Sequence, residues 1–272
     1  MRQPAIFVGH GNPLNAVVET FYARGWEALG ESLGQPRAIL VISAHWYVNG
    51  VAVTAMAAPR TIHDFGGFPP ELYAVQYPAP GSPALAEEIA ARLGPLPVRL
   101  DQHWGLDHGS WSVLRRLFPG AGIPVIQLSI DRREAGPFHY ELGRRLAPLR
   151  EEGVLILGSG NLVHNLAAYR WGQPDGPAED WAVRFEARVR RSLIERDPLP
   201  LIEWEKLGEE ARLAIPTPEH YLPLLYVMGA SDPSDQLDFP ITGVEGGTIS
   251  MLSVRYSATP PTPPTPATPP GG

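Results

Sequence analysis

The sequence predicts a single α/β domain with a central, mostly parallel sheet and helices on both faces. Short, continuously apolar runs alternate with amphipathic helical segments along the chain, which is the pattern of such a fold. The apolar runs lack polar alternation, as is typical of strands that are buried on both faces. The length of 272 residues suits one large domain. Because no linker or internal repeat interrupts residues 1–256, we expect one domain over that range.

The strands are expected at the short runs in which nearly every residue is apolar. These runs are Ala5–Gly9, Ala38–Ala44, Ile123–Ile130, Val154–Ser159 and, as the last strand, Thr248–Val254.

Three helices are marked by their capping residues or by their periodicity. Ser82 and Pro83 suit the N-cap and first position of a helix that ends near Leu93. Trp181–Leu193 repeats the same apolar spacing. The pair Thr217–Pro218 is expected to open a helix that continues to about Met228.

The segment 257–272 has a different composition, since it consists largely of proline and threonine. It has no large apolar side chain to bury, so we expect a disordered or polyproline II-like tail that the fold does not need.

Composition excludes several classes of function. A net charge of -7 without a basic tract argues against a nucleic-acid partner. The absence of cysteine excludes disulfides, thiolate metal sites and cysteine nucleophiles. No apolar run reaches the roughly 20 residues of a membrane helix, and no signal peptide is visible. The expectation is therefore a cytoplasmic protein without a membrane partner.

Histidines follow three of the expected strands. His10 comes directly after the first strand, His45 directly after the second, and His164 a few residues after Val154–Ser159. In an open parallel sheet, ligands bind outside the carboxyl ends of the strands. One such histidine is usually a hydrogen-bonded structural residue, but three at one edge indicate a metal site, because neutral imidazole binds zinc, iron and copper.

A fourth histidine, His220, lies near the start of the helix expected after Thr217–Pro218. The positive end of that helix dipole would lower its pKa and keep the ring able to bind a metal. The adjacent Glu219 is a second candidate ligand, because two histidines and one carboxylate form the usual non-haem Fe(II) site.

Other residues give weaker signals. His108 precedes an expected helix capped by Ser110 and could face the same edge of the sheet. His63 lies in a loop rich in glycine and aromatic residues, Thr61–Pro69, that is long enough to be a lid. His103 and His139 receive no role. No serine-hydrolase elbow or dinucleotide-binding glycine motif is present.

Seven motifs together resemble the 4,5-DOPA extradiol dioxygenases, which are class III ring-opening dioxygenases with the fold of the protocatechuate 4,5-dioxygenase catalytic subunit. The resemblance covers about residues 4–255. The motifs are Gly9–Pro13 (GHGNP), Ser43–Trp46 (SAHW), Thr61–Pro69 (TIHDFGGFP), Tyr77–Pro83 (YPAPGSP), Asp107–Trp111 (DHGSW), Gly158–Asn165 (GSGNLVHN) and Pro216–Pro223 (PTPEHYLP).

The resemblance implies a role for each candidate residue. His10, His45 and His220 would bind the metal, and His164 would be a fourth ligand or the acid–base residue. His108 would line the pocket as a second catalytic residue. His63 and Tyr221 are expected to contact the substrate. In the wider class the third ligand is a glutamate, so Glu219 remains an alternative to His220.

The implied reaction is the opening of a catechol such as L-DOPA by O2, which yields a ring-opened semialdehyde. Fe(II) suits this oxygen chemistry, whereas an all-histidine site also binds Zn(II) readily. A zinc-dependent hydrolase and a non-catalytic metal-binding protein are the alternatives. The sequence does not predict the oligomeric state.

Overall fold

The computed structural model describes residues 2–258 and contains a mixed eight-stranded sheet in the order β4-β3-β5-β2-β6-β1-β10-β7. The neighbours β5, β2, β6 and β1 are parallel. At one edge, β10 runs antiparallel to β1, and β7 runs antiparallel to β10. The strands are β1 (Ala5–Gly9), β2 (Ala38–Val48), β3 (Val51–Thr54), β4 (Val98–Asp101), β5 (Val125–Asp131), β6 (Val154–Gly160), β7 (Gln236–Asp238) and β10 (Val254–Ser257); β8 (Val244–Glu245) and β9 (Ile249–Ser250) form a separate pair.

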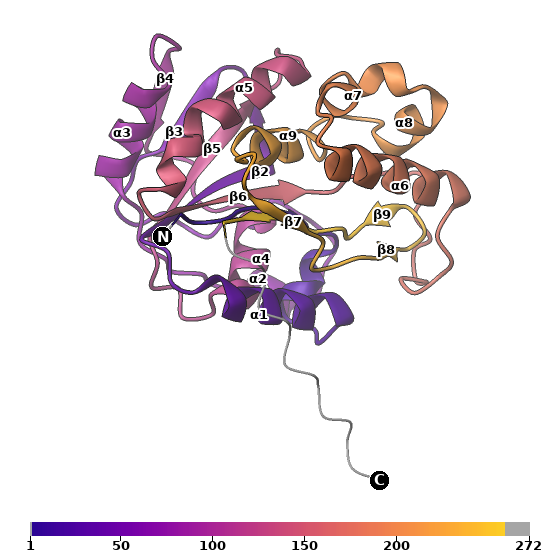
Figure 1. Cartoon of the computed structure of the whole chain (residues 1–272). Helices are drawn as coiled ribbons and strands as arrows, with labels where there is room; N and C mark the ends of the chain where they lie inside the picture. The colour runs from indigo at the N-terminus through magenta and orange to yellow at the C-terminus, as the bar shows by residue number, and fades with distance from the viewer. Residues whose placement is uncertain (1, 259–272) are drawn as a thin grey trace.

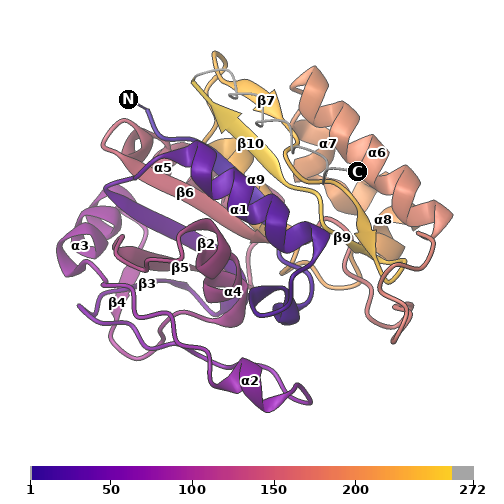
Figure 2. The same ribbon diagram turned by 90° about the horizontal axis from the view of Figure 1, so that it is seen from below.

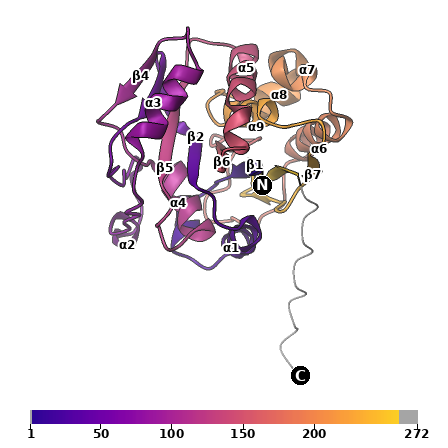
Figure 3. The same cartoon turned by 60° about the vertical axis from the view of Figure 1, so that its left-hand side comes forward.

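Helices cover both faces of the sheet, which confirms the expected architecture (Figures 1 and 3). α1 and α4 lie on one face, as Figure 2 shows, and α3, α5, α6 and α9 lie on the other. The helices are α1 (Phe21–Leu33), α2 (Pro70–Tyr73), α3 (Pro83–Arg92), α4 (His108–Leu117), α5 (Gly136–Leu146), α6 (Asp180–Glu195), α7 (Leu199–Ile202), α8 (Glu209–Ala214) and α9 (Leu222–Gly229), with 3-10 turns at Pro13–Ala16, Ala147–Arg150 and Trp204–Leu207.

The two faces of the sheet explain why its strands are continuously apolar. In β1, Ile6 and Val8 pack into the core under α1 and α4, whereas Ala5 and Phe7 pack into the core on the opposite face. Successive side chains of a strand point to opposite faces, so a strand covered on both sides needs apolar residues at every position.

The parallel pairing of β1, β2 and β6 ends at one edge of the sheet. The last paired residues there are Gly9 with Gly160 and Ser43 with Ser159. His10 is therefore the first residue beyond this ladder in β1, and His45 is the second beyond it in β2. The fold thus delivers both histidines to the carboxyl edge, where ligands of open α/β sheets bind.

Several predicted boundaries were wrong. His45 lies within β2, because that strand continues to Val48 through an irregularity after Ile42. The predicted last strand, Thr248–Val254, is two strands, β9 and β10, and β10 includes Ser257, the first residue of the predicted tail. Residues 259–272 of that tail lie outside the described residues.

Two predicted helix starts also differ. The helix after Thr217–Pro218 begins only at Leu222, so His220 occupies the turn before α9 rather than its first helical turn. α4 is capped by Asp107, whose carboxylate accepts a hydrogen bond from the Ser110 amide; Ser110 itself lies inside the helix. The predicted cap at Ser82 and the helix across Trp181–Leu193 are confirmed.

Among residues 2–258, none of the helices has both the length and the apolar character that a membrane crossing requires.

Candidate metal centre

Three histidines from three parts of the fold bring their ring nitrogens close together. His10 follows β1, His45 lies in β2 and His220 precedes α9, and their ligand atoms all lie within 4.8 Å of one another. The Nε2 atoms of His10 and His45 are 3.2 Å apart. The structure therefore brings together three of the four histidines that the sequence analysis named as candidate metal ligands; the fourth, His164, is not part of this cluster.

The ring of His10 is fixed by Ser159 of β6. Nδ1 of His10 lies 3.0 Å from the Ser159 hydroxyl oxygen, and that hydroxyl donates its proton to the carbonyl of Gly109 at 2.5 Å. Since a hydroxyl has one proton, Ser159 must accept from His10. The proton of the neutral ring is therefore on Nδ1, and Nε2 keeps a lone pair directed at the cluster.

His45 is held by a carboxylate. Its Nδ1 atom lies 3.4 Å from Oδ2 of Asp64, which favours a proton on that nitrogen and leaves Nε2 as a lone-pair donor. Oδ1 of the same carboxylate accepts a hydrogen bond of 2.9 Å from the backbone amide of His108. Asp64 thus joins the loop Thr61–Pro69 to the start of α4.

These tautomers give the cluster the character of a metal site. Two lone pairs on Nε2 atoms 3.2 Å apart repel each other unless a cation lies between them. Nitrogens bound at about 2.1 Å to one tetrahedral or octahedral ion are roughly 3.0–3.4 Å apart. The observed separation falls within that interval, so the donor set fits a bound divalent metal.

His220 is oriented by its neighbour. Its Nδ1 atom lies 3.3 Å from Oε1 of Glu219, and that oxygen also accepts a hydrogen bond of 2.7 Å from Thr217. Glu219 is outside the cluster of three donor nitrogens, although it lines the same cavity. The local geometry therefore makes Glu219 a support for His220.

His164 and His108 flank the cluster. The ring of His164 stacks on that of His220, with centroids 3.5 Å apart and planes 6° from parallel. The ring of His108 lies 3.8 Å from that of His45. Nδ1 of His108 is 3.0 Å from Oδ1 of Asp64 but does not meet hydrogen-bond geometry. Both rings are thus available to a molecule bound at the cluster.

Burial keeps the cluster uncharged. Burial is the main cause that lowers the pKa of His10 and of His220 well below the ordinary value, and the neighbouring histidines add to it. Burial likewise lowers the pKa of His45 to about 3 and that of His164 to about 4. Burial and the neighbouring histidines account for the lowered pKa of His220, so the helix dipole that the sequence suggested is not needed to explain it. Neutral imidazoles are the form that binds a metal.

A cavity of about 450 Å³ opens onto these histidines. Phe65 and Phe68, from the loop Thr61–Pro69, form part of its wall. Leu166, Tyr169 and Trp171 form another part. Walls of this kind suit a flat aromatic ligand, because they supply apolar contact around a polar centre.

Two sequence-based candidates do not line this cavity. His63 directs Nε2 to the Val75 carbonyl at 3.0 Å and packs behind Phe65, with ring centroids 5.8 Å apart. Tyr221 is fully buried, and its hydroxyl donates to the Leu201 carbonyl at 3.0 Å. This placement gives no support to direct substrate contacts by either residue.

Sequence reasoning also missed residues of the site. Asp64 was overlooked beside His63, although a carboxylate next to a candidate ligand is a signal that could have been used. Ser159 lay in a quoted motif but had no assigned role. Glu245 and Tyr169 gave no local signal, since only the fold brings β8 to the cavity.

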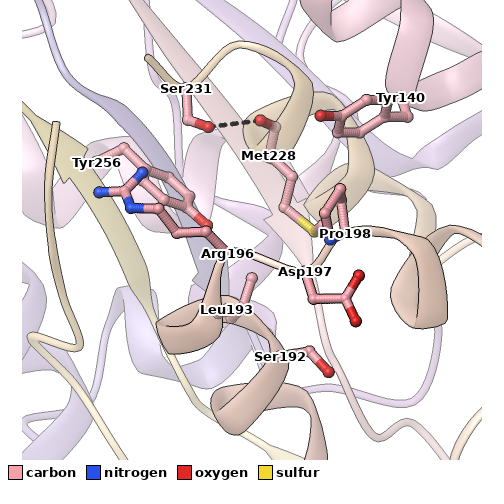
Figure 4. A pocket seen from close by; sticks show the side chains of 9 residues that line it. All are labelled: Tyr140, Ser192, Leu193, Arg196, Asp197, Pro198, Met228, Ser231 and Tyr256. Atoms are coloured by element: carbon pink, nitrogen blue, oxygen red, sulfur yellow. Dashed lines mark hydrogen bonds between the residues drawn. The ribbon is translucent and has the colours of Figure 1, made fainter. Parts of the chain in front are cut away.

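A second, smaller cavity of about 60 Å³ lies between α6, α9 and β10 (Figure 4). Its lining includes Tyr140, Arg196, Asp197 and Tyr256, and no histidine contributes to it. The histidine cluster and the larger cavity therefore mark the better candidate for chemistry.

Comparisons with known proteins agree with this geometry. Residues 9–246 match the family described as the catalytic LigB subunit of aromatic ring-opening dioxygenase. The chain is 49% identical to "4,5-DOPA dioxygenase extradiol" of Escherichia coli K12 over 93% of this chain and 94% of that protein. It is 37% identical to the protein of the same description from Beta vulgaris, over 93% and 96% of the two chains.

A solved structure shows the same fold. The crystal structure of an uncharacterized protein from Escherichia coli K12 superposes with a TM-score of 0.81 at 45% identity, over 93% of this chain and 99% of that chain. The family match spans most of the chain and includes the strand-end histidines. The chain therefore belongs to the LigB family of aromatic ring-opening dioxygenases, which are extradiol-cleaving oxidoreductases.

Proposed function

We propose that this protein opens the ring of a catechol such as L-DOPA with O2, to give a ring-opened semialdehyde of the 4,5-seco-DOPA type. The observation that carries the proposal is the convergence of ring nitrogens from His10, His45 and His220 within 4.8 Å, beside an aromatic-walled cavity. Relatives described as 4,5-DOPA dioxygenase extradiol support the choice of substrate class.

His10, His45 and His220 would hold one divalent ion through their unprotonated nitrogens. Fe(II) is the proposed catalytic ion, and Zn(II) fits the same donors, so a purified preparation can contain zinc. When bound, Fe(II) supplies the redox-active centre that catechol cleavage by O2 requires.

His164 is the proposed acid–base residue. Its ring lies against His220 rather than in the cluster of three donor nitrogens, and it lines the cavity. A neutral imidazole in this position can accept a proton from a catechol hydroxyl and return it later. His108, whose ring lies beside that of His45, would donate a hydrogen bond to negative charge that develops on oxygen.

The aromatic walls would hold the ring and limit access of water. Phe65 and Phe68 belong to a loop with exposed glycines at 66 and 67, and Phe65 packs 5.5 Å from the ring of His108. A loop of this composition can close over a bound catechol and exclude water. His63 would act indirectly, by supporting Phe65 from behind.

The test is oxygen consumption by protein loaded with Fe(II) under anaerobic conditions. Addition of L-DOPA in air should consume oxygen and produce a yellow, ring-opened product, whereas zinc-loaded protein should be inactive. If no member of a broad catechol panel supports oxygen uptake despite measured iron loading, the proposal is rejected. Hydrolysis of esters or amides by the zinc form would then favour the hydrolase alternative.

A further inference from the structure

One wall of the cavity holds a carboxylate that the proposed reaction does not use. Glu245, in β8, is 7% exposed and lines the cavity. Within residues 2–258, the ion pairs of the structure include none with Glu245. A buried carboxylate without a cation is costly, so this group is prepared to accept one from a ligand.

The side chains that influence the carboxylate of Glu245 are neutral or acidic. The Tyr169 hydroxyl donates to Oε1 at 3.0 Å. Burial raises the pKa of Glu245, the hydrogen bonds from Tyr169 and Asn15 oppose that shift, and the charge of Asp175 adds to it. No cation is among these influences, and the negative charge of Asp175 strengthens the preference for a positive ligand.

One aromatic ring, that of Tyr169, contacts the carboxylate through its hydroxyl, and a second, that of Trp171, packs on the first. The rings of Tyr169 and Trp171 are 4.9 Å apart in an edge-to-face arrangement, and both line the cavity. Trp171 is 70% exposed, which is unusual for a large aromatic side chain. Aromatic faces beside a carboxylate are the chemistry that recognises an ammonium group.

This wall lies close to the histidine cluster. A Cβ atom added to Gly11, the residue after His10, would be 3.5 Å from Oε2 of Glu245. The ring of Tyr169 packs directly on Gly246, where any added Cβ would overlap it. The carboxylate and its aromatic neighbour are thus fixed beside the residue that follows a proposed metal ligand.

We propose that Glu245, with Tyr169 and Trp171, binds the ammonium group of an aminoalkyl side chain on the catechol. Glu245 is then a specificity-determining residue that selects amine-bearing catechols over neutral or acidic ones. The inference rests on the proposed function, because it takes the ring to be bound at the histidine cluster.

The test compares dopamine with 4-ethylcatechol, which has the same ring and carbon chain but no amine. For wild-type protein loaded with Fe(II), kcat/KM for dopamine should exceed that for 4-ethylcatechol about tenfold or more, as expected for a charged hydrogen bond. Glu245→Gln should reduce this ratio toward one, with the loss falling on dopamine. The exposed Glu209 provides the control, since Glu209→Gln removes the same charge and should keep the wild-type ratio.

Trp171→Ala gives a second variant with little risk to folding, because the side chain is largely exposed. It should also lower the ratio. A wild-type ratio near one, or an equal loss for both compounds in the variants, overturns the inference. Anaerobic calorimetry with the same two compounds gives the ratio of their dissociation constants, which tests the same preference without turnover. Absence of oxygen uptake would therefore reject the proposed function, whereas the binding ratio would still decide on the ammonium site.

Discussion

Nδ1 of His10 lies 3.0 Å from the Ser159 hydroxyl, which in turn donates its only proton to Gly109. This chain of hydrogen bonds determines which nitrogen of His10 carries the proton and directs the other nitrogen at the cluster. Partners of metal-binding histidines commonly contribute to affinity in this way.

Ser159→Ala should therefore weaken metal binding about 10- to 100-fold. Without the Ser159 hydroxyl, Nδ1 of His10 loses its hydrogen-bond acceptor. The proton can then move to Nε2, where it blocks the lone pair that faces the cluster. Competition with a chelator of known affinity, followed by elemental analysis, measures the change. Ser253→Ala is the matched control, because the buried Ser253 hydroxyl has no hydrogen-bond partner in the described part of the chain. Equal affinity in the two variants would contradict the assigned role of Ser159.

Substitution of the histidines should separate metal ligands from the acid–base residue. His45→Ala removes a donor of the cluster and should abolish stoichiometric metal binding. His164→Ala should retain most of the metal and lose turnover, because His164 stacks on His220 outside the three donor nitrogens. Elemental analysis and oxygen uptake on the same preparations provide both measurements. Metal loss in His164→Ala as complete as in His45→Ala would instead make His164 a ligand.

Gly11→Ala should destabilise the region of the site by about 1–3 kcal/mol from backbone strain, with a further cost from a clash. Gly11 has a φ of 53°, and an added Cβ would lie 2.3 Å from the sulfur of Met251. Gly172→Ala separates the two effects, since Gly172 has a φ of 80° but open space around it. Urea unfolding of both variants gives the comparison. A cost in Gly11→Ala no larger than in Gly172→Ala would exclude the clash.

The central sheet and the sheet edge that carries the histidine cluster could be predicted from the sequence, because both depend on local patterns. Continuously apolar runs indicate buried strands, and His10 and His45 follow such runs directly. His220 was found from its motif, but its helix was misplaced. In Pro216–Pro223, prolines and a turn delay the start of α9 to Leu222, which local capping signals did not reveal.

The remaining parts of the site depend on long-range contacts. Glu245 reaches the cavity only because β8 and β9 form a separate hairpin beside the residues around Tyr169. Asp64 reaches His45 because its loop folds back across the sheet edge. A single sequence carries no signal for the approach of Glu245, and the only local signal for Asp64 is its place beside His63. The antiparallel strand β10 was equally hidden, since a break of three residues separates it from β9.

Arg150 forms a buried ion pair with Asp235, at 2.7 Å, and also donates to the carbonyls of Gln3 and Ala230. Both side chains are nearly inaccessible to solvent. Arg150→Ala would leave the Asp235 charge buried with fewer partners, at a cost of about 3–5 kcal/mol. Denaturant unfolding measures this loss. The exposed pair Arg144–Glu141 is the comparison, because Arg144→Ala should cost no more than about 1 kcal/mol.

His139 provides a prediction on pH that is independent of the metal site. It is fully buried in α5, where its Nε2 proton is donated to the Glu134 carbonyl at 3.2 Å and Nδ1 accepts from Tyr226 at 3.0 Å. Burial lowers its pKa from 6.5 to about 4. Between these pH values the unfolded chain binds a proton at His139 that the folded protein does not bind.

The contribution of His139 to stability is therefore complete above pH 6.5 and is lost as the pH falls toward 4. His139→Gln cannot titrate, so the difference in unfolding free energy between wild type and variant should shrink with falling pH, by at most about 1.4 kcal/mol per pH unit. The site histidines titrate in both proteins and cancel from the difference. Tyr226→Phe removes the hydrogen bond to Nδ1 but keeps the histidine, so its comparison with wild type should show a much smaller pH dependence. A difference between wild type and His139→Gln that stays constant from pH 7 to pH 4.5 would mean that His139 binds its proton equally well in the folded and unfolded chain, which its burial between α5 and α9 should prevent.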